Sequence, residues 1–348
     1  MNKHKILVLY TSIPSYWVAC MRKYVQLFNG EFIVFMDKPD LNAPYLVQDE
    51  AGITYHNRDD YTSKELEQLC FSLEPSLIYV CGWKYKSDIV LCKKLKNSVT
   101  ICGMDNWWHG TIKQILGLLP LKLVLQRAFD FLWVPGEPQI PYAEKLGFGG
   151  SKLITGLYSA DSDKIRGGEF RLESIRQKFV FIGRLVPEKG IDVLIDTYSR
   201  YRNTNPNAWG LEIIGDGPLK KDLSELQGVE IIDFLQPSEI QSRLKDFGVL
   251  VLPSLTEPWG VVLHEAARAG WPIIASDMCG ATTAFLETGE NGYFCKSGSV
   301  SSLLESMEKF TNMSPQELQE FSQASKELGG KHDTERWSKT LHDKLRKA

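Results

Sequence analysis

The sequence predicts an α/β protein of two domains, each built on a doubly wound parallel sheet. Short apolar runs alternate with helical patterns through the first half, as they do in chains of β-α-β units. A polar, irregular segment begins at Asp161, and a second series of such units follows it. The chain has 348 residues, which is enough for two domains of ordinary size. We therefore expect an N-terminal domain over 1–160, a linker over 161–177, a second domain over 178–330 and a closing helix over 331–348.

Within each domain the elements follow from the residue pattern. Strands are predicted where apolar residues run together between turn-forming residues, and helices where apolar residues recur every three to four positions. In the first domain these rules give strands at 6–10, 32–35, 77–80, 99–104 and 131–134. They give helices at 17–28, 64–72, 88–95, 112–129 and 142–146. In the second domain they give strands that run into Gly183 and Gly215 and a strand that ends at Leu252, with polar amphipathic helices over 315–347.

Composition and charge argue against several classes of protein. The chain has 40 Lys and Arg against 43 Asp and Glu, a net charge of −3, and no basic tail that would indicate a nucleic-acid partner. The seven cysteines are scattered without a C-x-x-C pair, so we interpret them as apolar side chains in a reducing compartment. The apolar run that starts at Ile6 is too short for a signal peptide. We therefore expect a cytoplasmic protein.

Two carboxylates frame the junction between a strand and a helix in the second half. Glu257 lies in the loop after the strand that ends at Leu252, and Glu265 lies eight positions later, about one turn inside the next helix. Between them stands Gly260, which has no side chain to keep a ligand away from the backbone. The free N–H groups of a helix start favour phosphate. The arrangement suits a ligand with phosphate in the middle and hydroxyl groups at both ends, as in a nucleotide sugar.

Positively charged residues follow the preceding strand at the same predicted sheet edge. Arg184 comes directly after the strand that runs into Gly183, and Lys189 follows a turn that contains a proline. Arginine offers a planar fork for phosphate oxygens, and lysine offers a compact charge. Gly215 opens a tight turn after the next strand. Because ligands of open α/β sheets bind at the carboxyl ends of the strands, we expect these turns to meet at one site.

The segments GRLVPEKGID, IIGDGP and LTEPWGVVLHEA resemble the donor-domain motifs of the group 1 glycosyltransferases, glycosyltransferase family 4, over about residues 178–295. The resemblance implies a GT-B fold, in which two Rossmann-like domains face a central cleft, and a reaction that retains the anomeric configuration. It also implies that the final helix crosses back to the first domain, where Trp337 is the expected anchor. Family members often carry a glycine near the nucleotide base where this chain has Phe234-Leu235-Gln236, and this difference leaves the identity of the base open.

The resemblance assigns roles to the donor-side residues. Glu257 would face the hydroxyl groups of the donor sugar, and Glu265 would bind the ribose. Arg184 and Lys189 would hold the diphosphate, and the backbone at Gly260 would contact the donor. The full expected donor-binding set is Gly183, Arg184, Lys189, Gly215, Leu235, Glu257, Trp259, Gly260, Val261, Val262 and Glu265.

Two stretches of the first domain follow predicted strands and are candidates for the acceptor side. After the first strand stand Ser15, Tyr16 and Trp17, whose aromatic rings would either stack on a sugar or pack between the domains. After the strand at 99–104 stands Trp107, a further acceptor-side candidate.

The same second stretch supplies a candidate group near the anomeric carbon. Many members of the resembling family carry a histidine just after this strand. Asp105 is nearest to that position here, whereas His109 has the matching chemistry one turn later, with a buried structural histidine as the alternative explanation. The candidate catalytic set is therefore Arg184, Lys189, Glu257, Asp105 and His109.

These residues predict a retaining glycosyltransferase that moves a hexose-type sugar from a nucleotide diphosphate to a saccharide or lipid-linked saccharide in cell-surface polysaccharide synthesis. A UDP-sugar is the favoured donor, with a GDP-sugar as the second option. No cofactor and no metal ion are expected, since Arg184, Lys189 and the helix start at Gly260 supply positive charge, and the D-x-D pattern at Asp161-Ser162-Asp163 lies in the linker. Two alternatives remain, a nucleotide-sugar epimerase of the same fold and a catalytically inactive nucleotide-sugar-binding protein.

The apolar stretch at 112–134 has two explanations. Pro120, Lys113, Lys122 and Arg127 interrupt it, whereas a helix that spans a membrane needs about 20 nearly uninterrupted apolar residues. One explanation is a helix buried under the first sheet. The other is that part of the stretch lies on the inner membrane face, with its lysines toward anionic headgroups, and presents the site to a lipid-linked acceptor.

Overall fold

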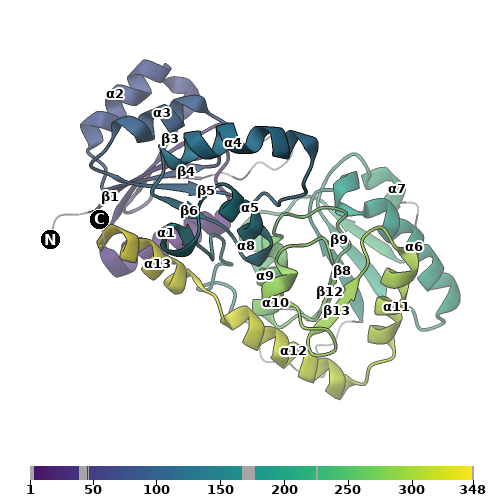
Figure 1. Ribbon diagram of the computed structural model, residues 1–348. Helices are drawn as coiled ribbons and strands as arrows, with labels where there is room; N and C mark the ends of the chain where they lie inside the picture. The colour runs from purple at the N-terminus through teal and green to yellow at the C-terminus, as the bar shows by residue number, and fades with distance from the viewer. Residues whose placement is uncertain (1–3, 39–44, 46, 167–176, 225, 347–348) are drawn as a thin grey trace. The chain divides into compact units, whose positions relative to one another are not determined.

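The computed structural model describes residues 4–38, 45, 47–166, 177–224 and 226–346. Its internal contacts divide the chain into two compact units, each built on a sheet with flanking helices (Figure 1). The first unit holds residues 1–159 together with 332–348, and the second holds residues 160–331. The chain therefore returns to the first unit at its end. Of the predicted linker, residues up to 166 belong to the second unit, and 167–176 lie outside the described residues.

The first unit contains a seven-stranded parallel sheet in the order β3-β2-β1-β4-β5-β6-β7. The strands are β1 (Lys5–Leu9), β2 (Glu31–Met36), β3 (Ile53–Asn57), β4 (Leu77–Cys81), β5 (Val99–Gly103), β6 (Phe131–Trp133) and β7 (Leu153–Ile154). The helices are α1 (Ser15–Phe28), α2 (Ser63–Leu73), α3 (Lys86–Lys94), α4 (Ile112–Gln126), α5 (Ile140–Lys145) and α13 (Thr334–Arg346), with short 3-10 helices η1 (Arg58–Asp60), η2 (Glu137–Gln139) and η3 (Gly150–Lys152). The strands β3 and β7 were not predicted. The first is mostly half-buried and polar, and the second has two residues, so neither gives a strong apolar signal.

Both faces of this sheet are covered, which explains why its strands are nearly continuous apolar runs. On one face, strand side chains such as Leu7, Phe35 and Val80 pack with buried residues of α2, α3, α4 and α5. On the other face, Tyr24 of α1 packs edge-on against Phe32 of β2. Successive side chains along each strand point to opposite faces of the sheet, so each strand contributes to the core on both sides.

The closing helix α13 packs against α1 in this unit. Trp337 is fully buried, and its ring centroid lies 5.0 Å from that of Trp133 and 5.0 Å from that of Trp17. Its indole Nε1 donates a hydrogen bond to the carbonyl oxygen of Leu157 at 2.9 Å. The helix is thus held by an aromatic cluster and by one satisfied buried donor.

The second unit contains a six-stranded parallel sheet in the order β10-β9-β8-β11-β12-β13. The strands are β8 (Lys178–Ile182), β9 (Gly210–Ile214), β10 (Val229–Ile232), β11 (Val249–Leu252), β12 (Ile273–Ser276) and β13 (Gly292–Cys295). The helices are α6 (Ile191–Thr204), α7 (Lys220–Ser224), α8 (Pro237–Arg243), α9 (Val261–Ala269), α10 (Thr282–Phe285), α11 (Val300–Thr311) and α12 (Pro315–Gly330), with the 3-10 helix η5 (Pro187–Lys189).

Each sheet reverses its strand order at one place. In the first unit this place lies between β1 and β4, and in the second it lies between β8 and β11. Open parallel sheets bind ligands outside the carboxyl ends of the two strands at such a point. The topology therefore indicates a ligand site at the loops that follow β8 and β11 in the second unit.

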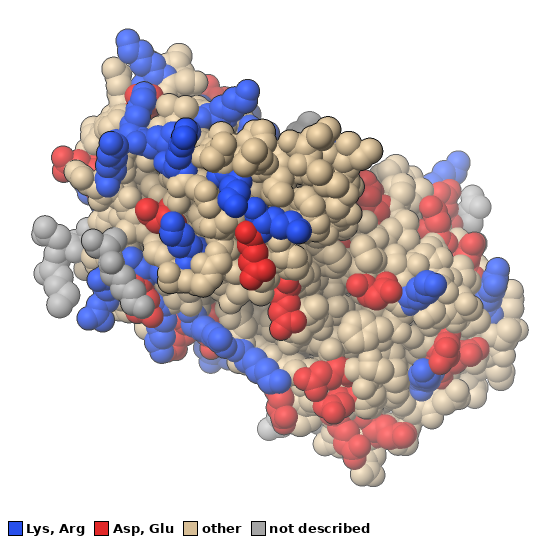
Figure 2. All heavy atoms as spheres, in the orientation of Figure 1, with Lys and Arg blue, Asp and Glu red and all other residues tan. Residues whose placement is uncertain are grey.

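Helix α4 is not the buried core helix that was one explanation of the apolar stretch. It begins with a capping box in which the Thr111 hydroxyl accepts from the N–H of Gln114 at 3.3 Å. Of the residues of the helix itself, Leu125 alone is buried, whereas Ile112 is 77% and Leu116 is 74% exposed. Figure 2 shows the surface over α4 as a mostly uncharged area with Lys and Arg side chains near its border. In the part of the chain that the structure describes, no helix has the length and apolar character needed to cross a membrane.

Candidate functional site

The loops that follow β8 and β11 touch each other where the strand order of the second sheet reverses. The N–H of Leu255 donates to the carbonyl oxygen of Glu188 at 2.8 Å. Gly190 has a φ of 69°, and a Cβ atom there would stand 2.2 Å from the carbonyl oxygen of Pro253. A larger residue would force the two loops apart. The backbone itself therefore fixes the distance between the loops.

The turn after β9 lies equally close to the turn after β8. The register pairs Ile182 with Ile214, so that Gly183 and Gly215 leave their strands at the same level. A Cβ atom at Gly215, whose φ is 152°, would stand 1.9 Å from the carbonyl oxygen of Gly183. Arg184 follows directly, is exposed, and makes no hydrogen bond or ion pair with any described residue. Its guanidinium group is therefore available to a ligand.

Lys189 and Glu257 form an ion pair across this junction. The Lys189 Nζ donates to Oε2 of Glu257, although the two residues stand 68 positions apart in the chain. Their side chains are 17% and 12% exposed. Removing an ion pair from water costs free energy unless the pair makes enough hydrogen bonds in the protein. A ligand that carries anionic and hydroxyl groups would offer both side chains further hydrogen bonds.

The backbone of neighbouring loops holds Glu257 at the start of α9. Its N–H donates to the carbonyl oxygen of Met278 at 3.0 Å, and its carbonyl oxygen accepts from the N–H of Gly280 at 3.1 Å. Gly260, the residue before α9, has a φ of 89°, and a Cβ atom there would stand 3.0 Å from Cγ of Glu257. No side chain among the described residues caps this helix, so its first N–H groups at Val261 and beyond can receive an anion.

Glu265 is partly buried on α9, one turn after the helix start. Burial, together with a smaller effect of the negative charge of Asp161, raises the pKa of its carboxyl group from an ordinary 4.5 to about 7. Asp161 is itself buried, and its Oδ1 accepts from the N–H groups of Asp163 and Lys164 at 3.2 Å each. No pattern in the sequence indicates that Asp161 lies near Glu265, because the two residues are distant in the chain.

The other predicted donor-side residues lie along the same sheet edge. Leu235 is partly buried in the loop after β10, next to β9 in the sheet. Trp259 is buried, and its indole Nε1 has no hydrogen-bond partner among the described residues. Val262 lies in the first turn of α9 and is partly buried. Across the described residues, no three His, Cys, Asp or Glu side chains gather in a way that would hold a metal ion.

In the first unit, Asp105 is held at the carboxyl end of β5. The Tyr158 hydroxyl donates to its Oδ2 at 3.2 Å, and Gln139 Nε2 donates to its main-chain oxygen at 3.2 Å. His109 is exposed, and its ring stacks with that of Trp107 at a centroid distance of 6.1 Å. The alternative of a buried structural histidine is therefore wrong for His109.

The stretch after β1 divides into two parts. Ser15 and Tyr16 are partly buried at the start of α1, and the Tyr16 ring lies edge-on to Tyr158 at 5.3 Å. Trp17 is only 1% exposed, with its ring 4.4 Å from that of Tyr79. Its selection as an acceptor-side residue is therefore corrected, because α1 turns this side chain into the core.

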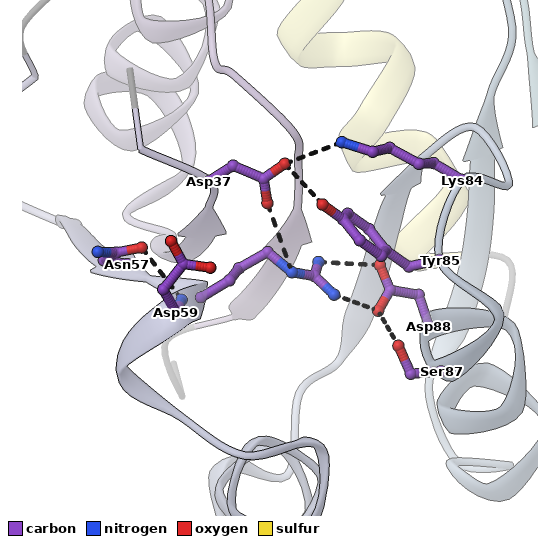
Figure 3. Close-up of polar contacts among 8 residues, drawn as sticks. Asp37, Asn57, Asp59, Lys84, Tyr85, Ser87 and Asp88 are labelled. Carbon is purple, nitrogen blue, oxygen red and sulfur yellow. Dashed lines mark hydrogen bonds and ion pairs between the residues drawn. The ribbon is translucent and has the colours of Figure 1, made fainter. Parts of the chain in front are cut away.

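A second charged cluster lies at the carboxyl ends of β2, β3 and β4, and its charged groups pair with one another (Figure 3). Two guanidinium nitrogens of Arg58 donate to the carboxylate of Asp88 at 2.9 and 2.6 Å, and both residues are buried. Asp37 accepts from the Tyr85 hydroxyl at 2.7 Å and from Lys84 at 3.1 Å. Since these charges are paired among themselves, the cluster fixes loops and offers little to a ligand.

The geometry of the second unit agrees with a match to a known family. Residues 169–328 match the family model described as glycosyl transferases group 1. This segment is a group 1 glycosyltransferase domain. The loops after β8, β9 and β11, and the helix start at α9, all lie inside the matched residues.

Two relatives are similar to part of this chain. Glycogen synthase of Mycobacterium tuberculosis is 32% identical over 133 residues, which cover 36% of this chain and 32% of the relative. A putative teichuronic acid biosynthesis glycosyltransferase of Bacillus subtilis is 30% identical over 153 residues, which cover 41% of this chain and 37% of the relative. The match therefore spans about a third of the length of these relatives.

Solved structures share the fold of both units. The Anabaena protein HepE, solved in complex with UDP, has a TM-score of 0.75 at 15% identity and covers 99% of this chain and 100% of its own. Sucrose-phosphate synthase from Thermosynechococcus elongatus has a TM-score of 0.75 at 14% identity and covers 99% of each chain. The group 1 glycosyltransferase domain is thus one of two Rossmann-like parallel-sheet domains of a GT-B fold.

Proposed function

We propose that this protein is a retaining glycosyltransferase that moves a hexose-type sugar from a nucleotide diphosphate, with UDP favoured, to a saccharide or lipid-linked saccharide acceptor. The observation that carries the proposal is the Lys189–Glu257 ion pair beside the uncapped start of α9, at the reversal point of the sheet. One partner suits phosphate and the other suits sugar hydroxyl groups. The UDP that is bound in the HepE structure supports a uridine nucleotide as the first choice.

The chemistry that these residues would perform is electrostatic. Arg184, Lys189 and the N–H groups at Val261 would stabilise the negative charge that grows on the departing diphosphate. Glu257 would leave its pairing with Lys189 to hold the donor sugar, and Glu265 would hold the ribose. The acceptor oxygen would attack the face from which the phosphate leaves, and its proton would pass to that phosphate. Catalysis would then rest on positioning and preorganised charge.

The acceptor side of the proposal belongs to the first unit. Asp105, which Tyr158 orients, is the favoured group near the anomeric carbon, while His109 is exposed and free to approach from its loop. Ser15, Tyr16 and Trp107 would contact the acceptor. The relative in teichuronic acid biosynthesis supports cell-surface polysaccharide synthesis as the setting. We place the reaction in the cytoplasm, at the inner membrane face when the acceptor carries a lipid.

Calorimetric titration with UDP, GDP and ADP tests the donor assignment. We expect UDP to bind most tightly, and we expect a UDP-hexose to be consumed when an acceptor is added, with retained anomeric configuration in the product by proton NMR. Release of an epimerised nucleotide sugar without an acceptor would identify an epimerase. Tight binding without turnover on any acceptor of a broad panel would identify a binding protein.

Removal of divalent metal ions is expected to leave activity nearly unchanged. In the proposed site, Arg184 and Lys189 would supply the positive charge with which a metal ion would otherwise neutralise the diphosphate. Transfer rates measured with excess EDTA, and again after Mn²⁺ or Mg²⁺ is added, check this expectation. A requirement for the ion beyond a modest stimulation would contradict this expectation. It would make the D-x-D pattern at Asp161 and Asp163 the candidate metal site.

A further inference from the structure

Helix α4 carries large apolar side chains on its outer side. Ile112, Leu116 and Leu119 are 77%, 74% and 65% exposed, and Ile115 and Leu123 are 56% and 47% exposed. These positions are spaced by three, four and seven residues, so they form one continuous stripe along the helix. We call these five residues the α4 stripe.

The opposite side of α4 is anchored in the first unit. Leu125 is fully buried in the core cluster, and Leu118 and Leu121 are partly buried and pack against it. These three residues are also spaced by three, four and seven positions, and they lie on the far side of the helix from the stripe. The sheet therefore fixes the orientation of α4 and holds the α4 stripe outward.

Positive charge borders the α4 stripe on both sides. Helix geometry puts Lys113 and Arg127 along one border and Lys122 along the other. No Asp or Glu occurs in residues 112–129. Figure 2 shows an uncharged area over α4 with basic side chains near it. An apolar stripe between basic borders is the pattern of a helix that lies in the interface of an anionic bilayer.

We propose that the α4 stripe inserts into the surface of a membrane that contains anionic lipids, while Lys113, Lys122 and Arg127 contact the headgroups. The basic residues favour an anionic bilayer as the partner of the α4 stripe. In a symmetric dimer through this stripe, the basic residues of one copy would face those of the other and repel them. The helix lies on the membrane and does not cross it. One part of this inference rests on the proposed function: if the protein is a glycosyltransferase, its acceptor is an amphiphile whose sugar end projects from the same membrane.

Co-sedimentation of the full-length protein with vesicles tests the proposal. Vesicles of phosphatidylcholine with one third phosphatidylglycerol should retain the protein at low salt, and vesicles of phosphatidylcholine alone should retain it much less. The double variant Leu116→Ser/Leu119→Ser should lower the partition coefficient by about tenfold or more, since two large apolar side chains no longer enter the lipid. Lys113→Glu/Lys122→Glu should lower it by a similar factor on anionic vesicles alone.

Matched variants elsewhere in the first unit are the controls. Phe71 and Val90 are 39% and 44% exposed on α2 and α3, so Phe71→Ser/Val90→Ser removes apolar surface away from α4. Lys64→Glu/Lys96→Glu reverses two exposed charges away from α4. Both control pairs should bind vesicles as the unchanged protein does. Because every substituted residue of the stripe is exposed, thermal unfolding should be unaffected in all variants.

Two results would overturn the proposal. One is equal retention of the unchanged protein and of Leu116→Ser/Leu119→Ser on anionic vesicles. The other is a stable dimer in sedimentation velocity that Leu116→Ser/Leu119→Ser converts to a monomer, which would assign the stripe to contacts between copies.

The vesicle measurement is independent of the proposed function. If the protein binds vesicles through α4 but transfers no sugar, the membrane inference stands and the glycosyltransferase proposal fails. If it transfers sugar to a water-soluble acceptor but does not bind vesicles, the glycosyltransferase proposal stands and the membrane inference fails. Transfer to a lipid-linked acceptor in vesicles should fall in Leu116→Ser/Leu119→Ser, while UDP affinity stays the same.

Discussion

Replacing Lys189 by alanine is expected to slow sugar transfer by about a hundredfold, because loss of one preorganised charge-stabilising donor costs roughly 3 kcal/mol of barrier. The effect should be large because Lys189 is mostly buried at the sheet edge, where its charge is weakly screened. Arg184→Ala should also slow transfer strongly. Steady-state rates with a UDP-hexose donor, together with thermal unfolding curves, measure both effects.

A second lysine–glutamate pair, at the start of β8, supplies the control. Lys178 is the first residue of β8, at the amino end of that strand and away from the candidate site at the carboxyl ends, and its Nζ donates to Glu212 at 2.7 Å. Lys178→Ala therefore breaks a comparable lysine–glutamate pair away from the candidate site, and it should leave the transfer rate unchanged. If Lys189→Ala and Arg184→Ala both transfer sugar at nearly the normal rate, the assignment of the diphosphate site is wrong.

The sequence could place the predicted donor-side residues at one edge of the second sheet, because the residues there must satisfy local rules. Gly183 and Gly215 stand where strands end, and Gly190 and Gly260 stand where helices begin. The structure shows why a side chain does not fit at Gly190, Gly215 and Gly260. The Lys189–Glu257 contact then follows from topology, since the carboxyl ends of β8 and β11 are neighbours. Alternating apolar runs were likewise enough to predict both parallel sheets.

The sequence could not predict features that depend on which face of an element is buried. Trp17 and the residues of the α4 stripe are all large and apolar, yet the first is in the core and the others are exposed. Periodicity shows that α4 is a helix, but the core packs against Leu125 and its neighbours, and the outer side is also apolar. The proximity of Asp161 to Glu265 depends on how the chain enters the second unit, for which no local pattern exists.

Replacement of Glu265 is expected to weaken nucleotide binding. Glu265→Ala should weaken the binding of UDP by about tenfold to a hundredfold, since hydrogen bonds to a charged group are worth about 1.5–3 kcal/mol. Glu257→Ala should weaken the binding of an intact UDP-hexose but hardly that of UDP, because Glu257 is assigned to the sugar. Equal losses of UDP affinity in both variants would contradict this division of roles.

The raised pKa of Glu265 gives a second, independent test. Folding raises this pKa from 4.5 to about 7, so the folded protein holds the proton more tightly than the unfolded chain does. The free energy of unfolding therefore falls as pH rises from about 4.5 to about 7, and at pH 8 the carboxylate costs stability on the order of 3 kcal/mol. Glu265→Gln should raise the melting temperature at pH 8 and leave it nearly unchanged at pH 5, where Glu265 is already neutral.

Ligand binding should titrate with the same group but in the opposite direction. A UDP-hexose has no group of its own that ionises near neutral pH, so any change in its affinity there reports on the protein. If the carboxylate accepts hydrogen bonds from the ribose hydroxyl groups, the affinity of the unchanged protein should rise as pH rises through about 7. Glu265→Gln should bind with a flat pH profile over the same range. A stabilised Glu265→Gln variant that keeps the pH-dependent affinity of the unchanged protein would show that Glu265 is buried beside Asp161 for structural reasons alone and does not touch the nucleotide.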